Sequence, residues 1–181
     1  MLVCGEDLGM IPDCVPEIMD ELEILCLKIQ RMPSEPHLEF GLTDLYPYMS
    51  VATPSCHDMS TIRGWWEEMS NEQKQKFYNN ILGYNGEPPV YCEPFIVEKI
   101  LQDHLESDSM WAVFPIQDLV ALDEDIRREN PIDEQINIPA NPKHYWCYRF
   151  HLDIEDLLEH DDLNNQIYRL IDNAKRAAVS Y

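Results

Sequence analysis

The chain has 181 residues, which falls in the usual range for one domain and is long enough to bury a core. Hydrophobic residues make up 45% and charged residues 26%, an ordinary globular composition that argues against disorder. The 34 acidic and 13 basic residues give a formal net charge of -21, which disfavours nucleic acid and anionic membranes as partners and is compatible with a neutral substrate.

The cysteines do not form a recognisable metal-binding or disulfide pattern. They contain no C-x-x-C pair, and a chain of this length does not need disulfides for stability, so we expect reduced, structural thiols. No apolar run approaches the ~20 residues of a membrane span, and we predict a cytoplasmic protein. The six cysteines are Cys4, Cys14, Cys26, Cys56, Cys92 and Cys147.

The first predicted elements are a strand, a helix and a second strand. The opening run Met1–Gly5 is apolar and uncapped, so it predicts a piece excised from a longer protein, with Leu2–Cys4 as the end of a buried strand. Asp13 is the expected N-cap of a helix, and the run Ile24–Ile29 is short and uniformly apolar, which favours a second buried strand. The apolar face of the intervening helix is formed by Val15, Ile18, Met19 and Leu22.

The middle of the chain predicts a loop, a third strand and two helices. Residues 32–47 contain three prolines and are expected to form a loop, and residues 48–53 form the third strand, which Pro54 ends. Residues 59–69 predict a helix. A capping-box pattern at residues 70–73 opens the next helix, which runs to Leu82.

Two more helices and one strand are predicted in the C-terminal half. After a turn-rich segment, residues 83–94, the apolar residues between Ile96 and Leu105 recur at helical spacing. Residues 110–114 form the fourth strand, and residues 163–171 lie in a closing helix.

Four buried strands separated by helical crossovers imply a parallel sheet, hence an α/β fold in a single domain over residues 1–181. Four strands are half of an eight-stranded barrel, and polar residues close or follow each strand, where α/β barrels carry their chemistry. These residues are Glu6 and Asp7, then Lys28 and Arg31, then His57 and Asp58, and last Gln117 and Asp118.

Two of these strand ends have a chemical and a structural interpretation. Glu6, in the turn between Gly5 and Gly9, can act as a general acid if its surroundings are partly apolar, but the spacing alone favours a turn or capping role. His57 and Asp58 can bind hydroxyls and stabilise positive charge on a sugar ring, or can form a turn. A nucleophile at Cys56 or Ser55 beside His57 is disfavoured, because adjacent strand residues point to opposite faces.

The aromatic residues also have a ligand-binding and a structural interpretation. Trp65 and Trp66 can form a platform for sugar stacking, but a structural role, with one of them in the core and the other only partly buried, is favoured. The aromatic cluster at residues 145–149 is expected to pack in the interior. Asn137, within an apolar run, is either a ligand contact or a turn former.

Together these segments resemble the 4-alpha-glucanotransferases, the amylomaltases or disproportionating enzymes of glycoside hydrolase family 77, and most of all the plant cytosolic type. The order and spacing agree across essentially the whole chain, which is more specific than any single motif. The residues that carry the resemblance are 5–9 with 11–12, 50–68, 115–119, 136–141 and 145–146.

The resemblance implies that the chain is the C-terminal half, strands 5–8, of a (β/α)8 TIM barrel. It implies that Glu6 is the catalytic acid/base, Asp58 the transition-state stabiliser and His57 a contact to sugar hydroxyls, while Asp7 and Asn137 line substrate subsites. The family nucleophile, an aspartate at the end of strand four, has no counterpart here. Gln135 stands where the family usually has arginine, which puts a charge contact at that position in doubt.

The implied activity is transfer of alpha-1,4-glucan segments between maltooligosaccharides by retaining double displacement, with Glu6 protonating the leaving oxygen and then deprotonating the acceptor. The mechanism needs no metal and no organic cofactor. The expected partners are these glucans and the missing N-terminal half of the barrel, without which the chain is expected to be inactive. The alternative is a noncatalytic acidic domain for glucan binding or protein association, and the open half-sheet favours self-association.

Overall fold

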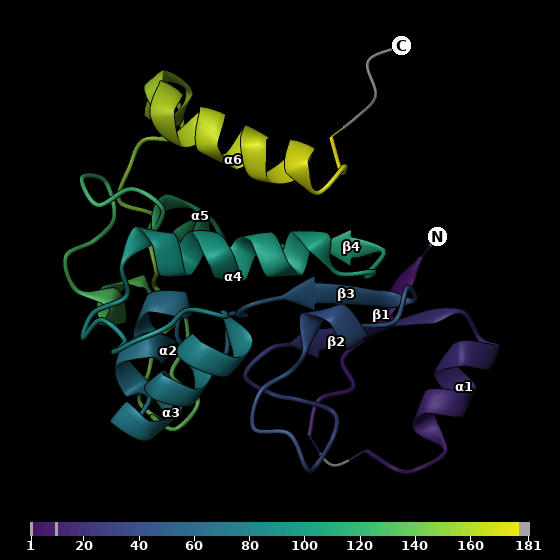
Figure 1. Ribbon diagram of the computed structural model, residues 1–181. Helices are drawn as coiled ribbons and strands as arrows, with labels where there is room; N and C mark the ends of the chain where they lie inside the picture. Colours follow the sequence, from purple (N-terminus) through teal and green to yellow (C-terminus); the bar gives the residue numbers. More distant parts are fainter. Residues whose placement is uncertain (1, 10, 178–181) are drawn as a thin grey trace.

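The computed structural model describes residues 2–9 and 11–177 and contains one parallel four-stranded sheet with helices packed on it (Figure 1). The strand order is β1-β2-β3-β4, so every strand pairs with the next one along the chain. The strands are β1 (Val3–Gly5), β2 (Ile24–Ile29), β3 (Ser50–Thr53) and β4 (Trp111–Ala112). The helices are α1 (Val15–Glu21), α2 (Ile62–Glu68), α3 (Asn71–Lys76), α4 (Pro94–Glu106), α5 (Ile116–Val120) and α6 (Asp161–Asn173). The predicted α/β class with a parallel sheet is confirmed.

The core lies on the helical side of the sheet, toward the C-terminal two-thirds of the chain. Helix α4 lies between the sheet and α6, and α2 and α3 lie at one end of the assembly (Figure 1). The largest fully buried side chains include Trp66, Phe77 and Ile100. Trp66 is fully buried and Trp65 is 7% exposed, so the predicted structural role is confirmed, Trp65 is more buried than predicted, and neither ring can form a sugar platform.

Several helix signals act as the sequence predicts. Ser70 and Gln73 form the predicted capping box at the start of α3, and the helix continues to Leu82 through a widened π turn at Phe77–Ile81. Helix α2 begins three residues later than predicted, because Thr61 is its N-cap and accepts a hydrogen bond from the Gly64 amide.

The N-terminal strand is more exposed than predicted. Leu2 and Val3 are 55% and 47% exposed, because β1 is an edge strand with β2 on one side only. Asp13 is not the N-cap of α1. Cys14 has that place, and Pro16 in the first turn fixes the helical backbone without a side-chain cap. The prediction for Met1 lies outside the described residues.

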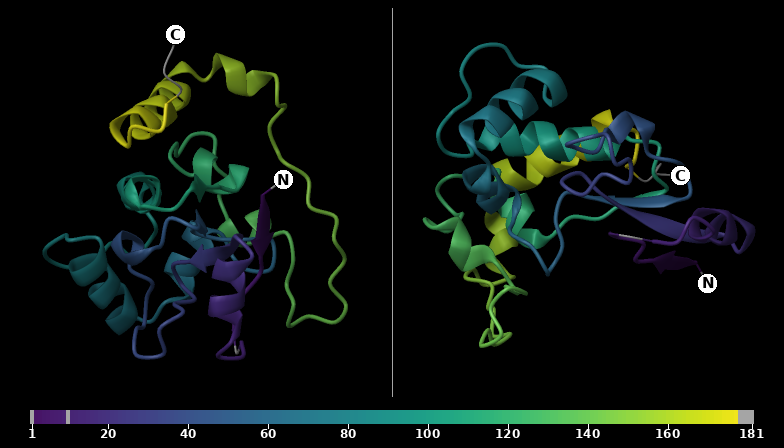
Figure 2. Two further views of the ribbon diagram at one scale, coloured as in Figure 1. Left: turned by 90° about the vertical axis from the view of Figure 1, so that its right-hand side faces the viewer. Right: turned by 90° about the horizontal axis from the view of Figure 1, so that it is seen from below.

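The fourth strand is shorter than predicted and the chain beyond it is mostly irregular. Strand β4 keeps only two residues, and a helix that was not predicted, α5, follows it directly. After α5 the chain contains two short 3-10 helices, Pro131–Glu134 and Asp156–Glu159, within a long surface segment that connects to α6 (Figure 2). All six cysteines are free, and Cys92 is the buried one among them.

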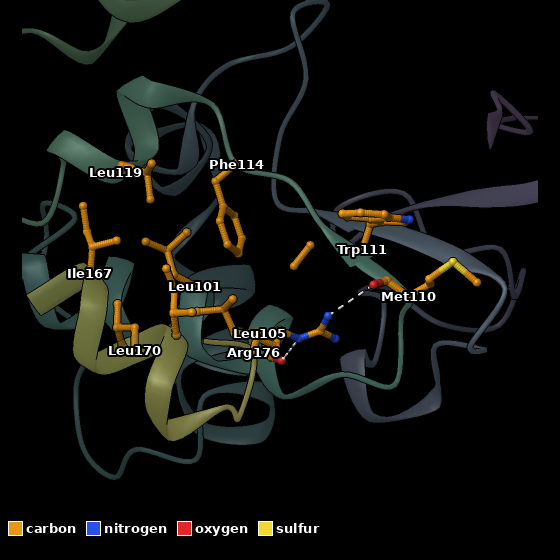
Figure 3. A pocket seen from close by; sticks show the side chains of 11 residues that line it. Leu101, Leu105, Met110, Trp111, Phe114, Leu119, Ile167, Leu170 and Arg176 are labelled. Atoms are coloured by element: carbon orange, nitrogen blue, oxygen red, sulfur yellow. Dashed lines mark hydrogen bonds between the residues drawn. The ribbon is translucent and has the colours of Figure 1, made fainter. Parts of the chain in front are cut away.

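An apolar cavity of about 480 Å³ lies between α4, α5, α6 and β4 (Figure 3). Phe114, Leu101 and Ile167 point toward it, and Arg176 closes one end. The Arg176 guanidinium donates hydrogen bonds to the carbonyls of Leu105, Ser107, Ser109 and Met110, and it thereby fixes the end of α6 to the α4–β4 connection.

Candidate active site

Three polar side chains that the sequence singled out form a cluster beyond the end of β3. His57 Nε2 lies 3.4 Å from Asp58 Oδ2, and Asn137, 79 residues further along the chain, donates from Nδ2 to Asp58 Oδ1 at 2.7 Å. The backbone N–H of Asn137 also donates to the backbone carbonyl of His57 at 3.1 Å. Asn137 is therefore a contact of Asp58 and supports the position of His57.

The cluster is open to solvent. The side chains of His57 and Asp58 are 51% and 46% exposed, so their polar atoms are accessible to a ligand. Gln135, which stands where the family usually has arginine, donates from Nε2 to the Asn137 carbonyl at 2.9 Å and thereby helps to shape this segment.

Glu6 and Asp7 follow β1, at the same carboxyl edge of the sheet. Glu6 is exposed, so this chain does not supply the partly apolar surroundings that would suit a general acid. Asp7 is half-buried and accepts a hydrogen bond from the Leu27 amide of β2 at 2.8 Å, which continues the β1–β2 pairing by one side-chain contact. Gly9 has a φ of +83°, which accounts for glycine in this turn.

Gly5 is in close contact with side chains of the protein itself. A Cβ atom there would lie 3.0 Å from the Met19 Cε of α1 and 3.3 Å from the Ile24 side chain. Gly5 thus lets α1 pack on β1 rather than making room for a bulky ligand.

The strand ends are staggered along the sheet. Gly5 is level with Cys26 in β2, whereas Thr53 is level with Ile29, three residues further along the same strand. At about 3.3 Å per residue, β3 ends about 10 Å beyond β1. Such a stagger is what closure of a sheet into a barrel requires.

Asp118 does not face the carboxyl edge as an exposed acid, contrary to the sequence prediction. It is fully buried in the first turn of α5, where Oδ1 accepts from the Ile62 amide at 2.8 Å and Oδ2 accepts from the Ser55 hydroxyl. These two residues flank the segment that carries His57 and Asp58, so one carboxylate ties both ends of that segment. The bond from Ser55 to Asp118 also argues against Ser55 as a nucleophile activated by His57.

Arg31, after β2, holds the same segment from the other side. Its guanidinium donates to Ser60 Oγ at 2.8 Å, to the Ser60 carbonyl at 2.7 Å and to the Thr61 carbonyl at 3.2 Å. The guanidinium also lies 4.9 Å from the centre of the Trp65 ring. Arg31 and Asp118 together fix the backbone that presents Asp58.

The sequence did not reveal the anchoring roles of these two residues. Arg31 and Asp118 were recognised only as polar residues after strands, and nothing in a one-dimensional pattern distinguishes a buried anchor from an exposed ligand-binding group. The partners of Asp118 are 56 and 63 residues away in the chain.

The predicted interior packing of the aromatic cluster at residues 145–149 is wrong for its first members. Tyr145 is 80% exposed and Trp146 57% exposed, because this part of the chain lies on the surface and forms neither a strand nor a helix. The centre of the Trp146 ring lies 5.3 Å from that of His57.

Burial raises the pKa of Asp118 from 3.8 to about 6. The folded state therefore binds more protons than the unfolded state between about pH 4 and 6, and the free energy of unfolding falls as pH rises through this window. A shift of about 2 pKa units corresponds to about 3 kcal/mol. His104, whose pKa burial lowers from 6.5 to about 4, acts in the opposite sense over the same range.

We therefore expect Asp118→Asn to remove the contribution of this carboxyl group to the pH dependence of stability, while its hydrogen bonds to Ile62 and Ser55 are kept. The Asn carbonyl can accept from the Ile62 amide while its NH2 group donates to the Ser55 hydroxyl. Urea unfolding at pH 4 and pH 7 measures the difference in stability between wild type and variant, in which the His104 contribution cancels. The unfolding free energy of the variant minus that of the wild type should be about 3 kcal/mol more positive at pH 7 than at pH 4. Parallel curves for the two proteins would contradict the assignment.

The described part of the chain contains neither a candidate metal site nor a membrane-spanning helix. Among residues 2–9 and 11–177, no group of three or more His, Cys, Asp or Glu side chains is placed to hold a metal ion. Within the same residues no helix is long and apolar enough to cross a membrane.

A parallel α/β sheet with an imidazole, a carboxylate and an amide gathered beyond the carboxyl end of one strand has its polar groups where enzymes of this architecture bind and convert ligands. Comparison with known proteins specifies the family. The sequence model of the 4-alpha-glucanotransferases matches residues 1–154. The chain belongs to the 4-alpha-glucanotransferase family.

Two relatives and one solved structure illustrate the relationship. 4-alpha-glucanotransferase DPE2 from Oryza sativa subsp. japonica is 47% identical over 177 residues, which cover 98% of this chain and 19% of the rice protein. The 4-alpha-glucanotransferase from Chlamydia trachomatis serovar D is 31% identical over 180 residues, covering 94% of this chain and 32% of that protein. The amylomaltase from Streptococcus agalactiae in complex with acarbose superposes with a TM-score of 0.73 at 20% identity, covering 97% of this chain and 32% of that structure. The chain thus spans between a fifth and a third of the length of these proteins.

Proposed function

We propose that this chain supplies the acid/base and the transition-state stabiliser of a 4-alpha-glucanotransferase that transfers alpha-1,4-glucan segments between maltooligosaccharides. The observation that carries the proposal is the His57–Asp58–Asn137 cluster at the carboxyl edge of the parallel sheet. Three side chains that the family resemblance assigned to one site come from two distant segments and meet there.

In the proposed mechanism Asp58 stabilises the positive charge that develops on the sugar ring, and His57 binds its hydroxyls. Asn137 holds the Asp58 carboxylate by its 2.7 Å hydrogen bond and leaves the second carboxylate oxygen to the ligand and His57. The nucleophilic aspartate of a preceding segment forms a bond to the anomeric carbon while Glu6 protonates the leaving glycosidic oxygen. Glu6 then deprotonates the acceptor hydroxyl, whose oxygen displaces the aspartate from the anomeric carbon, so the reaction proceeds by double displacement with retention. Asp7, with one oxygen on the Leu27 amide, lines a neighbouring subsite with the other.

We propose that the chain forms one domain over residues 1–181 and corresponds to strands 5–8 of a (β/α)8 barrel whose nucleophilic aspartate belongs to a preceding segment. The exposed edges of β1 and β4 are where that segment would pair. Trp111 and Val113, each 53% exposed, would be covered there together with the mouth of the apolar cavity. The exposed position of Glu6 fits the same proposal, because the apolar surroundings of a general acid would come from the other half.

A chimera tests this function. The matched 177 residues of the rice relative are replaced by this chain, and disproportionation of maltotriose is followed by chromatography of the products. We expect the chimera to transfer glucan segments, and the chain alone to show no transfer. A folded chimera without activity would contradict the proposal.

The alternative, a noncatalytic domain for glucan binding or protein association, is favoured by the same exposed edges. Size-exclusion chromatography with light scattering distinguishes the two when it is combined with the chimera assay. Self-association of the chain together with an active chimera supports an enzyme half with open edges. Self-association with an inactive, folded chimera supports the association domain. We also propose that the protein is located in the cytoplasm.

A further inference from the structure

An exposed tryptophan stands beside the proposed site. Trp146 is 57% exposed, and its ring centre lies 5.3 Å from that of His57 with an angle of 53° between the ring planes. Of the other three tryptophans, two are buried in the core, and Trp111 lies on β4 beside the apolar cavity. Trp146 is thus the tryptophan whose ring both contacts the site and faces solvent.

The backbone around Trp146 is tied to the segment after β3. The Asn137 amide donates to the His57 carbonyl at 3.1 Å, and the His144 ring nitrogen Nε2 lies 2.9 Å from the Ile136 carbonyl oxygen. The His144 amide also donates to the Asn141 carbonyl at 2.9 Å, which closes a turn two residues before Trp146. Trp146 therefore follows a turn whose backbone is hydrogen-bonded to the strand-end segment that carries His57.

The chemistry of a glucose ring suits this pairing of groups. A pyranose has hydroxyl groups around its rim and apolar C–H bonds on its two faces. Carboxylate, imidazole and amide groups satisfy the rim, as Asp58, His57 and Asn137 are placed to do. The C–H face needs a flat apolar surface, and a large aromatic ring supplies one together with a polar N–H at its edge.

We propose that Trp146 is a substrate-binding residue that packs against the C–H face of a glucose ring whose hydroxyls are held by His57 and Asp58. The inference rests on the proposed function and adds to it an apolar binding face that neither the sequence pattern nor the family comparison assigns. Tyr145, the preceding residue, is 80% exposed and is accessible to the same ligand.

The test uses the whole chain labelled with 5-fluorotryptophan, whose four 19F signals are assigned by single Trp→Phe variants and followed during titration with maltoheptaose. We expect the Trp146 signal to shift in a saturable way and the Trp111 signal to stay in place. Trp146→Ala should weaken binding at least tenfold, whereas Trp146→Phe should retain most of the affinity and the matched control Trp111→Ala all of it. Because Trp146 is exposed, the Trp146→Ala protein should have the same thermal unfolding midpoint as the wild type.

Three outcomes separate this inference from the proposed function. If His57→Ala abolishes binding and Trp146→Ala does not, the aromatic face is wrong and the glucan site stands. If the Trp146 signal shifts with the same affinity in His57→Ala, the indole belongs to a separate binding surface and the inference is overturned. If maltoheptaose moves no signal and binds by no other measure, both the inference and glucan binding by this chain are overturned.

Discussion

Glu6→Gln is expected to lower the kcat of the rice chimera for maltotriose disproportionation by about 10³-fold, within the 10²- to 10⁴-fold that general acid–base catalysis contributes. The amide can still bind a sugar oxygen but can neither donate a proton to the leaving group nor accept one from the acceptor. Because Glu6 is exposed and follows an edge strand, the substitution should leave the fold intact.

A leaving group that needs no proton separates this role from a structural one. With maltosyl fluoride as donor, glycosyl transfer to the enzyme should occur at a near-normal rate in Glu6→Gln, whereas Asp58→Asn should remain impaired with both donors. The matched control is Glu17→Gln, another exposed acid on the neighbouring α1, which should not change the kinetics. Equal activity of Glu6→Gln and wild type on maltotriose would show that the acid/base is another residue.

The largest expected effect on stability comes from the buried ion pair between α2 and the segment after α5. Arg63 Nη1 lies 2.6 Å from Glu134 Oε1, and the two side chains are 7% and 1% exposed. Arg63 also donates to the carbonyls of Arg128 and Glu129, and Glu134 accepts from the Thr61 hydroxyl. Burial raises the pKa of Glu134, and Arg63 together with the Thr61 hydroxyl opposes this rise by stabilising the carboxylate.

Arg63→Ala should therefore cost about 3–5 kcal/mol of unfolding free energy, because it leaves a carboxylate buried without its partner. For a chain of this length the loss corresponds to a fall in Tm of about 10 °C. The matched control is Lys76→Ala, which breaks exposed pairs with Glu72 and Glu39 and should melt close to the wild-type temperature.

A double variant, Arg63→Met with Glu134→Leu, should recover part of the loss, because no uncompensated charge then remains. Calorimetric melting of the three variants checks these values. If Arg63→Ala melts at the same temperature as the wild type, the ion pair does not stabilise the contact between α2 and the segment after α5.

Elements that depend on local pattern were predictable from the sequence. Strand β2 reads as a continuous apolar run and has the predicted bounds, and Ser70 with Gln73 forms the predicted capping box. Both are decided by residues within one element, so the linear pattern contains the needed information.

Features that depend on distant neighbours were not predictable. The exposure of β1 follows from the lack of a strand on its outer side within this sheet, and the burial of Asp118 follows from partners more than fifty residues away. Within the site, the family resemblance named His57, Asp58 and Asn137, but only the structure shows that Asn137 holds the Asp58 carboxylate and that Trp146 stands beside His57.

The central claim is that Glu6 and Asp58 act on the same substrate, although the described chain places them after strands two positions apart with staggered ends. A crystal structure of the chimera with bound acarbose measures this directly. We predict the Glu6 carboxylate within hydrogen-bonding distance of the linking atom next to the sugar ring whose hydroxyls Asp58 binds. If Glu6 and Asp58 contact sugar units that are not adjacent, or if Glu6 points away from the ligand, the proposed catalytic roles are wrong.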